Sequence, residues 1–177
     1  MTETCQTTTN YSGATSLGGG GNTIKKVGVI LDTGHPAIGT TVTTVSFYLS
    51  KYGSPSGTPS CKVWDDTGSN VATSSSSTLD DWEDLTTSYV KVTFTFSAGF
   101  TPAADYRIAI EGGTTSDSNE VNLGSSSPSE YTNQEQSYYR TNTSSWTDNS
   151  TRSVSWCWSS GSVSTSNVFP PPPVAYI

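Results

Sequence analysis

The side chains that could perform acid–base or nucleophilic chemistry are few and scattered in this sequence. His35 is the only histidine, and it lies in a Gly-His-Pro loop between two segments with strand-like patterning. A serine, a histidine and an aspartate can form a triad from distant parts of a chain, so a hydrolase that uses His35 remains an alternative. The sequence contains no Gly-x-Ser-x-Gly nucleophile motif. We therefore expect His35 to be a loop residue rather than a catalytic base.

Four of the fifteen acidic residues cluster in one loop. Asp80, Asp81, Glu83 and Asp84 surround Trp82 within residues 74–88. Glycoside hydrolysis needs two carboxylates held about 5–10 Å apart across a cleft. Adjacent acids of one loop seldom face each other in that way, so we predict no catalytic residue and no enzymatic activity.

A second acidic segment, Asp-Asp-Thr-Gly-Ser-Asn, contains possible calcium ligands in Asp65, Asp66 and Asn70. Calcium binds several carboxylate and carbonyl oxygens, and the EF-hand loop adds a distal bidentate glutamate that this segment lacks. A turn in which Asp65 or Asp66 accepts hydrogen bonds from the backbone is the simpler interpretation. We predict no cofactor, with a structural calcium ion at these three residues as the alternative.

Aromatic side chains with polar neighbours are the main candidates for binding. They could form flat platforms for sugars, or they could pack at an interface, where Tyr and Trp are also enriched. We expect Tyr48 and Trp64 to point outward from adjacent strands and to mark a contact surface. The full candidate set is Tyr48, Tyr52, Trp64, Trp82, Tyr138, Tyr139 and Trp146.

The elements that position these residues are predicted to be strands. Alternation of apolar and polar residues is clearest at residues 24–32, 42–50 and 89–97, and no segment shows sustained helical periodicity. Further short strands are expected at 60–64, 70–73, 105–111, 119–123, 137–141 and 152–158. Eight or nine short strands separated by turn residues predict an all-β protein, an antiparallel β-sandwich of the jelly-roll type.

The domain is expected to cover residues 24–161, with an arm at each end. Residues 1–23 are rich in Gly, Thr and Ser and contain a tetraglycine, so we predict an extended N-terminal arm. Residues 162–177 contain four consecutive prolines, which favour a stiff spacer. Apolar side chains flank the prolines on both sides, so we expect this C-terminal arm to dock onto a neighbouring subunit. The docking residues would be Phe169, Val174, Tyr176 and Ile177. A disordered end is the alternative.

The amino-acid composition limits the classes of partner and the cellular locations that we expect for this protein. Charged residues are only 13% of the chain and the net charge is −7, which argues against nucleic acid, since phosphate binding needs clustered Lys and Arg. No apolar run is long enough for a membrane helix. The composition is typical of extracellular β-proteins, yet the first thirty residues lack a signal-peptide pattern. We therefore expect a virion or another extracellular location, reached by a route such as cell lysis.

Three cysteines allow at most one disulfide within the chain. Cys61 is expected to face inward from its strand as a small apolar side chain. Cys157 lies between Trp156 and Trp158 and is expected to point opposite to them. The spacing does not decide whether any of Cys5, Cys61 and Cys157 are bonded.

Three consecutive segments, 47–51, 53–58 and 63–65, resemble the repeated pattern FYLxKxGxPxGT…VxD of jelly-roll modules in archaeal, bacterial and phage surface or virion proteins. Segments 92–96, 106–108, 138–140 and 146–148 fit the later part of that pattern. The resemblance covers roughly residues 24–160 and implies a jelly roll in a carbohydrate-binding-like appendage, an adhesion domain or a virion decoration. The chain departs from the pattern at Pro59 and in the tryptophans of its last strand.

These observations together predict a non-enzymatic structural protein of a virion or an extracellular filament. It would assemble with copies of itself or with other structural subunits through its jelly-roll faces and terminal arms. The alternative is a carbohydrate-binding or adhesion module at a cell surface, with polysaccharide as the partner.

Overall fold

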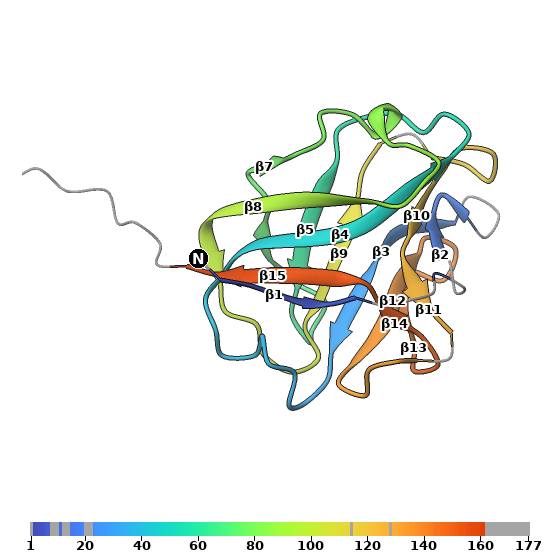
Figure 1. The fold of residues 1–177 in the computed structure, drawn as a ribbon. Helices are drawn as coiled ribbons and strands as arrows, with labels where there is room; N and C mark the ends of the chain where they lie inside the picture. The colour runs from blue at the N-terminus through green and yellow to red at the C-terminus, as the bar shows by residue number, and fades with distance from the viewer. Residues whose placement is uncertain are drawn as a thin grey trace, which may run out of the picture.

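The structure, a computed structural model, describes residues 2–7, 11, 15–19, 23–113, 115–127 and 129–161. Within these ranges the chain forms antiparallel β-strands and one short 3-10 helix, η1 (Trp82–Asp84). The predicted all-β sandwich of antiparallel sheets is confirmed (Figure 1). No helix in the described part of the chain is long and apolar enough to cross a membrane.

Two large sheets form the layers. The seven-stranded sheet contains β1 (Glu3–Gln6), β2 (Thr15–Leu17), β4 (Val42–Tyr52), β7 (Ser76–Ser77), β8 (Val90–Phe100), β10 (Glu120–Leu123) and β15 (Trp156–Ser160). The six-stranded sheet contains β3 (Ile24–Leu31), β5 (Ser60–Trp64), β6 (Asn70–Thr73), β9 (Arg107–Glu111), β12 (Gln134–Arg140) and β13 (Ser145–Asn149). A separate short pair is formed by β11 (Ser125–Ser126) and β14 (Ser153–Val154).

The strand order shows how the layers are connected. The six-stranded sheet has the order β13-β12-β3-β9-β5-β6. In the seven-stranded sheet β4 is central. It pairs with β8 along one of its edges, and with β15 and then β10 along its opposite edge. Most consecutive long strands belong to different sheets, so the chain passes back and forth between the layers, as it does in a jelly roll. The exceptions are the hairpins β5–β6 and β12–β13.

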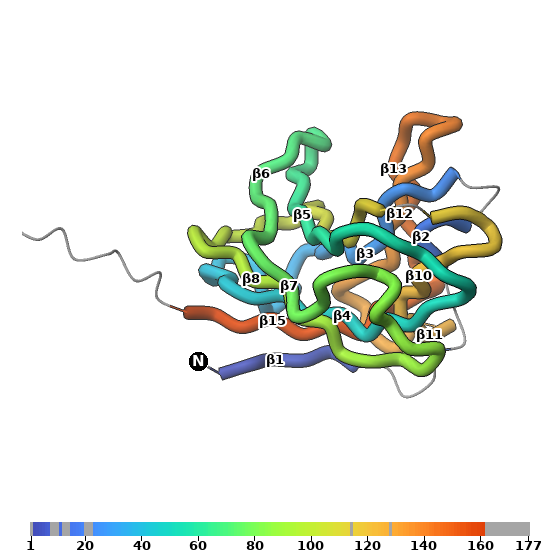
Figure 2. The backbone as a smooth tube through the Cα atoms, turned by 90° about the horizontal axis from the view of Figure 1, so that it is seen from above, coloured from blue at the N-terminus to red at the C-terminus, as the bar shows by residue number. Residues whose placement is uncertain are grey.

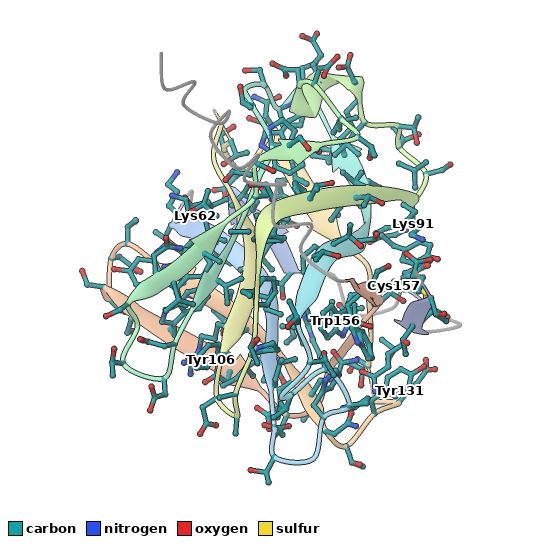
Figure 3. The ribbon with its side chains drawn as sticks, turned by 90° about the vertical axis from the view of Figure 1, so that its left-hand side faces the viewer. Lys62, Lys91, Tyr106, Tyr131, Trp156 and Cys157 are labelled. Atoms are coloured by element: carbon teal, nitrogen blue, oxygen red, sulfur yellow. A yellow bond between two sulfur atoms is a disulfide. The ribbon has the colours of Figure 1, made fainter. Side chains whose placement is uncertain are left out.

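The core follows the predicted alternation. The predicted inward face of β3, formed by Val27, Val29 and Leu31, is completely buried, and so is that of β4. Trp156 of β15 lies between the sheets (Figure 3). Burial of some twenty large apolar side chains is the main stabilising contribution to the fold. The alternation at residues 89–97 places Val90 on the same face as Val92, Phe94 and Phe96, but Val90 is 37% exposed at the start of β8.

The prediction of an extended N-terminal arm is wrong for the described residues. β1 pairs with β15 and β2 pairs with β10, so this segment extends the seven-stranded sheet (Figure 1). A disulfide joins Cys5 of β1 to Cys157 of β15. The docking residues predicted in the C-terminal arm, Phe169, Val174, Tyr176 and Ile177, lie outside the described residues.

The prediction that Tyr48 and Trp64 lie on adjacent strands is also wrong. Both side chains point away from the core, but β4 and β5 belong to different sheets. The loop between them crosses from one layer to the other instead of closing a hairpin. The two aromatic residues are therefore on opposite outer faces of the sandwich.

Candidate functional site

His35 is sealed inside the protein, only 2% exposed. The backbone N–H of Ala37 donates to its Nδ1, so Nε2 carries the proton and donates to Gln6 Oε1 at 2.9 Å. The ring stacks against Trp156 and Trp158. Burial lowers the pKa of His35 to about 4. A neutral, enclosed imidazole with both nitrogens bonded inside the fold gives no support to the hydrolase alternative.

The acidic loop around Trp82 serves as a helix cap. The carboxylate of Asp81 accepts from the backbone N–H of Glu83 at 2.9 Å and from that of Gly57 at 2.9 Å. The Asp84 carboxylate accepts from the backbone N–H of Asp81, which completes a capping box. These hydrogen bonds explain Asp81 and Asp84, two of the four clustered acids, as local structure.

Asp65 is the acceptor that closes the turn between β5 and β6. Its Oδ1 accepts from Thr67 Oγ1 at 2.7 Å and from the Ser69 N–H at 2.8 Å, and these bonds lower the pKa of the carboxyl. The amide nitrogen of Asn70 donates to the carbonyls of Val63 and Ala72. Asp65 and Asn70 therefore act as turn residues, which favours the simpler of the two interpretations of this segment.

Two of the seven aromatic candidates pack against the core instead of lying on an outer face of the sandwich. Trp82 is fully buried in the core, where its Nε1 donates to Gly112 O at 3.1 Å. Tyr138 pairs with Val27 and packs against the core. Tyr52, at 62% exposure, is the most exposed large apolar side chain among the described residues. Tyr48 lies apart from these on the outer face of the seven-stranded sheet.

The remaining three candidates, Trp64, Tyr139 and Trp146, meet on the outer face of the six-stranded sheet. The Trp64 and Trp146 rings are 5.2 Å apart and those of Tyr139 and Trp146 are 5.6 Å apart, both edge to face. Lys26 lies over all three rings, with its Nζ 4.3 Å from the Trp64 centroid and 4.6 Å from the Tyr139 centroid. We refer to these four residues as the aromatic cluster.

The curvature of the six-stranded sheet makes the aromatic cluster possible. Trp64 on β5 and Trp146 on β13 are separated by four strand-to-strand steps, which would be about 19 Å in a flat sheet. Figure 2 shows the β5–β6 and β12–β13 ends of the sheet turning the same way, away from the other layer. The outer face is therefore concave, and side chains from distant strands meet above its centre.

Gly28 lies at the centre of that concave face. A Cβ on Gly28 would lie 2.0 Å from Ile108 O and 2.7 Å from the Cβ of Ala109, which is on the neighbouring strand. Only glycine allows such a close approach. The small residues at this point let the sheet coil tightly beneath the aromatic cluster.

Charged pairs surround the aromatic cluster. Arg107 binds Asp148 through Nη2 at 2.6 Å and also lies 5.6 Å from the Trp146 ring. Lys62 pairs with Glu111. Burial lowers the pKa of Lys26, and the negative charge of Glu111 partly opposes that shift. The surface therefore combines a cation and two ion pairs with aromatic rings and an arginine, and only the aromatic and arginine side chains belong to the residue types enriched in protein interfaces.

A second aromatic group, which sequence reasoning missed, lies on the other outer face. Tyr11 contacts Tyr89 at 4.3 Å between ring centroids and Tyr48 at 6.4 Å. Burial raises the pKa of both Tyr11 and Tyr89. The Tyr11 ring lies so close to Gly124 that a Cβ there would be 2.8 Å from it. Since Tyr11 belongs to the segment expected to be an arm, no sequence pattern indicated this contact.

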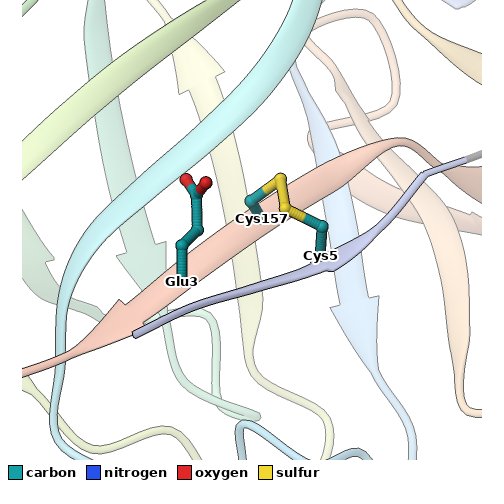
Figure 4. A group of neighbouring side chains, drawn as sticks. All are labelled: Glu3, Cys5 and Cys157. Carbon is teal, nitrogen blue, oxygen red and sulfur yellow. A yellow bond between two sulfur atoms is a disulfide. The ribbon is translucent and has the colours of Figure 1, made fainter. Parts of the chain in front are cut away.

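Glu3, Cys5 and Cys157 form a compact group on the same outer face (Figure 4). Their ligand atoms lie within 4.8 Å of one another. The two sulfur atoms are bonded to each other, and Glu3 pairs with Lys91 Nζ at 2.5 Å. In this oxidised form the group is a cross-strand disulfide with an adjacent ion pair, not a metal centre.

A scan against protein-family models, a search of curated proteins and a search of solved structures each gave no match to this chain.

Proposed function

We propose that this protein is a non-enzymatic structural unit of a virion or an extracellular filament, and that it assembles with copies of itself or with other structural subunits. The observation that carries the proposal is the closure of the fold by its first and last described strands. β1 lies beside β15, and the Cys5–Cys157 disulfide joins them across 152 residues of sequence.

This closure favours a structural role for two reasons. Disulfides persist in oxidising surroundings, as on virions and outside cells. A cross-link that closes a long loop removes conformational freedom from the unfolded chain and so stabilises the folded state. A sandwich whose first and last described strands are cross-linked suits a protein that must keep its shape rather than move.

The concave outer face of the six-stranded sheet supplies the contact surface in this proposal. The three aromatic residues of the cluster and the neighbouring Arg107 are of the types enriched in interfaces. The edge strand β6 adds a second contact, because it pairs only with β5 in the described part of the chain and carries Val71, which is 46% exposed. An edge strand offers backbone groups to a strand of another subunit.

The alternative, a carbohydrate-binding or adhesion module, has one observation in its favour. Tyr139 and Trp146 are only half-buried and lie beside charged side chains on the concave face. Trp64, however, is 4% exposed, and the rings meet edge to face. The cluster therefore presents less flat aromatic surface than a sugar platform would need, and we rank the structural role first.

Size-exclusion chromatography with light scattering separates the two functions. Large symmetric assemblies support the structural unit. A monomer that is retained on immobilised polysaccharide supports the binding module and contradicts the structural proposal.

A further inference from the structure

The group formed by Glu3, Cys5 and Cys157 has the atoms for a second chemical role once its disulfide is opened. Glu3 and Cys5 lie two residues apart on β1, so their side chains share one face of the strand. Cys157 is directly opposite Cys5 on β15. Figure 4 shows the Glu3 carboxylate and the two sulfur atoms rising from the same side of the two strands. A carboxylate oxygen and two sulfur atoms therefore lie within 4.8 Å of one another.

Reduction of the bond between Cys5 and Cys157 changes what these atoms can bind. A dithiol reductant transfers two electrons and two protons to the bond and becomes a disulfide itself, and the two cysteines become thiols. A divalent cation that binds them displaces both thiol protons to water, since the thiolate is the metal ligand. Thiols stay reduced inside cells, whereas disulfides persist in oxidising surroundings. The group therefore has two chemical forms, and each belongs to a different environment.

The sulfur atoms need only a small movement to suit a tetrahedral ion. Zinc binds sulfur at about 2.3 Å and carboxylate oxygen at about 2.0 Å, which places neighbouring ligand atoms about 3.5–3.8 Å apart. Rotation of the two cysteine side chains supplies that separation while the backbone stays in place. The contacts that hold β1 do not involve sulfur: its residues pair with those of β15, and Gln6 is bonded to His35 at 2.9 Å.

Lys91 supplies the charge balance that such a site requires. Its Nζ lies 2.5 Å from Oε1 and 2.6 Å from Oε2 of Glu3. Two thiolates and a carboxylate carry three negative charges, which a divalent cation and the ammonium group of Lys91 balance. The side chains of Glu3 and Lys91 are 37% and 34% exposed, so water can occupy the fourth ligand position of the ion.

We propose that the reduced protein binds one Zn²⁺ ion through the thiolates of Cys5 and Cys157 and the carboxylate of Glu3. Thiolate ligands favour zinc, whereas Mg²⁺ and Ca²⁺ prefer oxygen ligands. The ion takes the place of the disulfide as the link between β1 and β15, so the same strand pair is held together in reducing and in oxidising surroundings. This site goes beyond the proposed structural role and does not depend on it.

Titration of the full chain with Zn²⁺, and with Cd²⁺ as a spectroscopic probe, tests the proposal. The protein is reduced with a phosphine, which has no thiol to compete for the metal. The reduced protein should bind one ion per chain, and Cd²⁺ should produce thiolate-to-metal charge-transfer absorption in the ultraviolet. Zn²⁺ should raise the urea midpoint of the reduced protein and leave that of the oxidised protein unchanged. Cys5→Ser should weaken binding about a hundredfold or more and Glu3→Gln about tenfold, because even changes outside the ligand set cost about 10–100-fold.

The matched control for Glu3→Gln is Glu83→Gln, which changes an exposed carboxylate of η1 and should leave the affinity unchanged. Cys61→Ser removes the remaining thiol and should also have no effect on the affinity. Circular dichroism checks the fold of each protein, and it should show that Zn²⁺ restores the fold if reduction alone loosens it. Equal Zn²⁺ affinity of the oxidised and reduced proteins overturns the proposal, as does undiminished binding by reduced Cys5→Ser. A reduced protein that binds no Zn²⁺ also overturns it.

Discussion

Trp64 and Trp146 touch edge to face, with ring centroids 5.2 Å apart, although they lie on strands four steps apart in one sheet. The contact exists because the six-stranded sheet curves away from the core around Gly28. This relationship turns an outer sheet face, which would ordinarily be flat and solvated, into a concave surface with aromatic content.

The aromatic cluster should stabilise the fold measurably. Trp146→Ala removes both edge-to-face contacts and should lower the free energy of unfolding by about 2 kcal/mol, because aromatic pairs contribute beyond the area that they bury. Tyr52→Ala, at the most exposed aromatic position, is the matched control and should change stability by less than about 0.5 kcal/mol. Urea denaturation followed by fluorescence measures both. Equal losses of unfolding free energy for the two substitutions would show that the aromatic cluster does not stabilise the fold more than an exposed aromatic residue does.

The curvature of the sheet should depend on the absence of a side chain at residue 28. Gly28→Ala places a Cβ against the backbone of β9, so we expect a loss of about 3 kcal/mol or more in unfolding free energy. Pulse proteolysis in urea measures this even for a poorly stable variant. Thr73→Ala, on the edge strand of the same sheet, serves as the control with little expected change. A stable Gly28→Ala protein would contradict the close approach of β3 and β9.

The disulfide should account for a large share of the stability. Cys5→Ser should lower the free energy of unfolding by about 3 kcal/mol. A reductant should lower the free energy of unfolding of the wild-type protein by a similar amount. The same reductant should leave Cys5→Ser unchanged. Cys61 remains as a buried free thiol, and burial raises its pKa, so it should react with alkylating agents only on unfolding. Reductant sensitivity in the Cys5→Ser variant would contradict the assigned pairing.

The buried histidine should make the fold sensitive to mild acid. The pKa of His35 is about 4 in the folded state and 6.5 in its unperturbed form. Between these values the unfolded state binds a proton that the folded state excludes, so stability is complete above pH 6.5 and falls as the pH drops towards 4. The loss should reach about 3 kcal/mol at most.

Urea midpoints of the wild-type protein and of His35→Gln at pH 7, 6, 5 and 4.5 measure this effect. The variant should be less stable at pH 7, because it loses the stacking on Trp156 and Trp158. Its stability should then fall less steeply with acid than that of the wild type. Parallel pH profiles for the two proteins would mean that His35 is not the group that titrates.

The long strands could be predicted from the sequence because their inner faces must alternate with their outer faces. β3, β4 and β8 show this alternation, and the inward residues Val92, Phe94 and Phe96 are buried as predicted. β1 and β2 could not be predicted in this way. Their residues are mostly Thr, Ser, Cys and Gln, which lack an apolar face, and their position depends on pairing with strands more than 100 residues away.

The candidate site was only partly predictable for the same reason. Trp64, Tyr139 and Trp146 were identified as aromatic residues beside polar neighbours, but their meeting depends on sheet curvature, which leaves no local pattern. Trp82 was misjudged because a loop residue among acids usually faces solvent, whereas the capping box turns this ring into the core.

The assembly state of the purified protein tests the structural role most directly. Light scattering and negative-stain microscopy should be carried out on the full chain, on Trp146→Ala and on a chain that lacks residues 168–177. We predict regular assemblies for the full chain, weaker assembly for both altered proteins, and a folded sandwich in all three by circular dichroism. A full-length protein that stays monomeric at every concentration and binds polysaccharide would contradict the account.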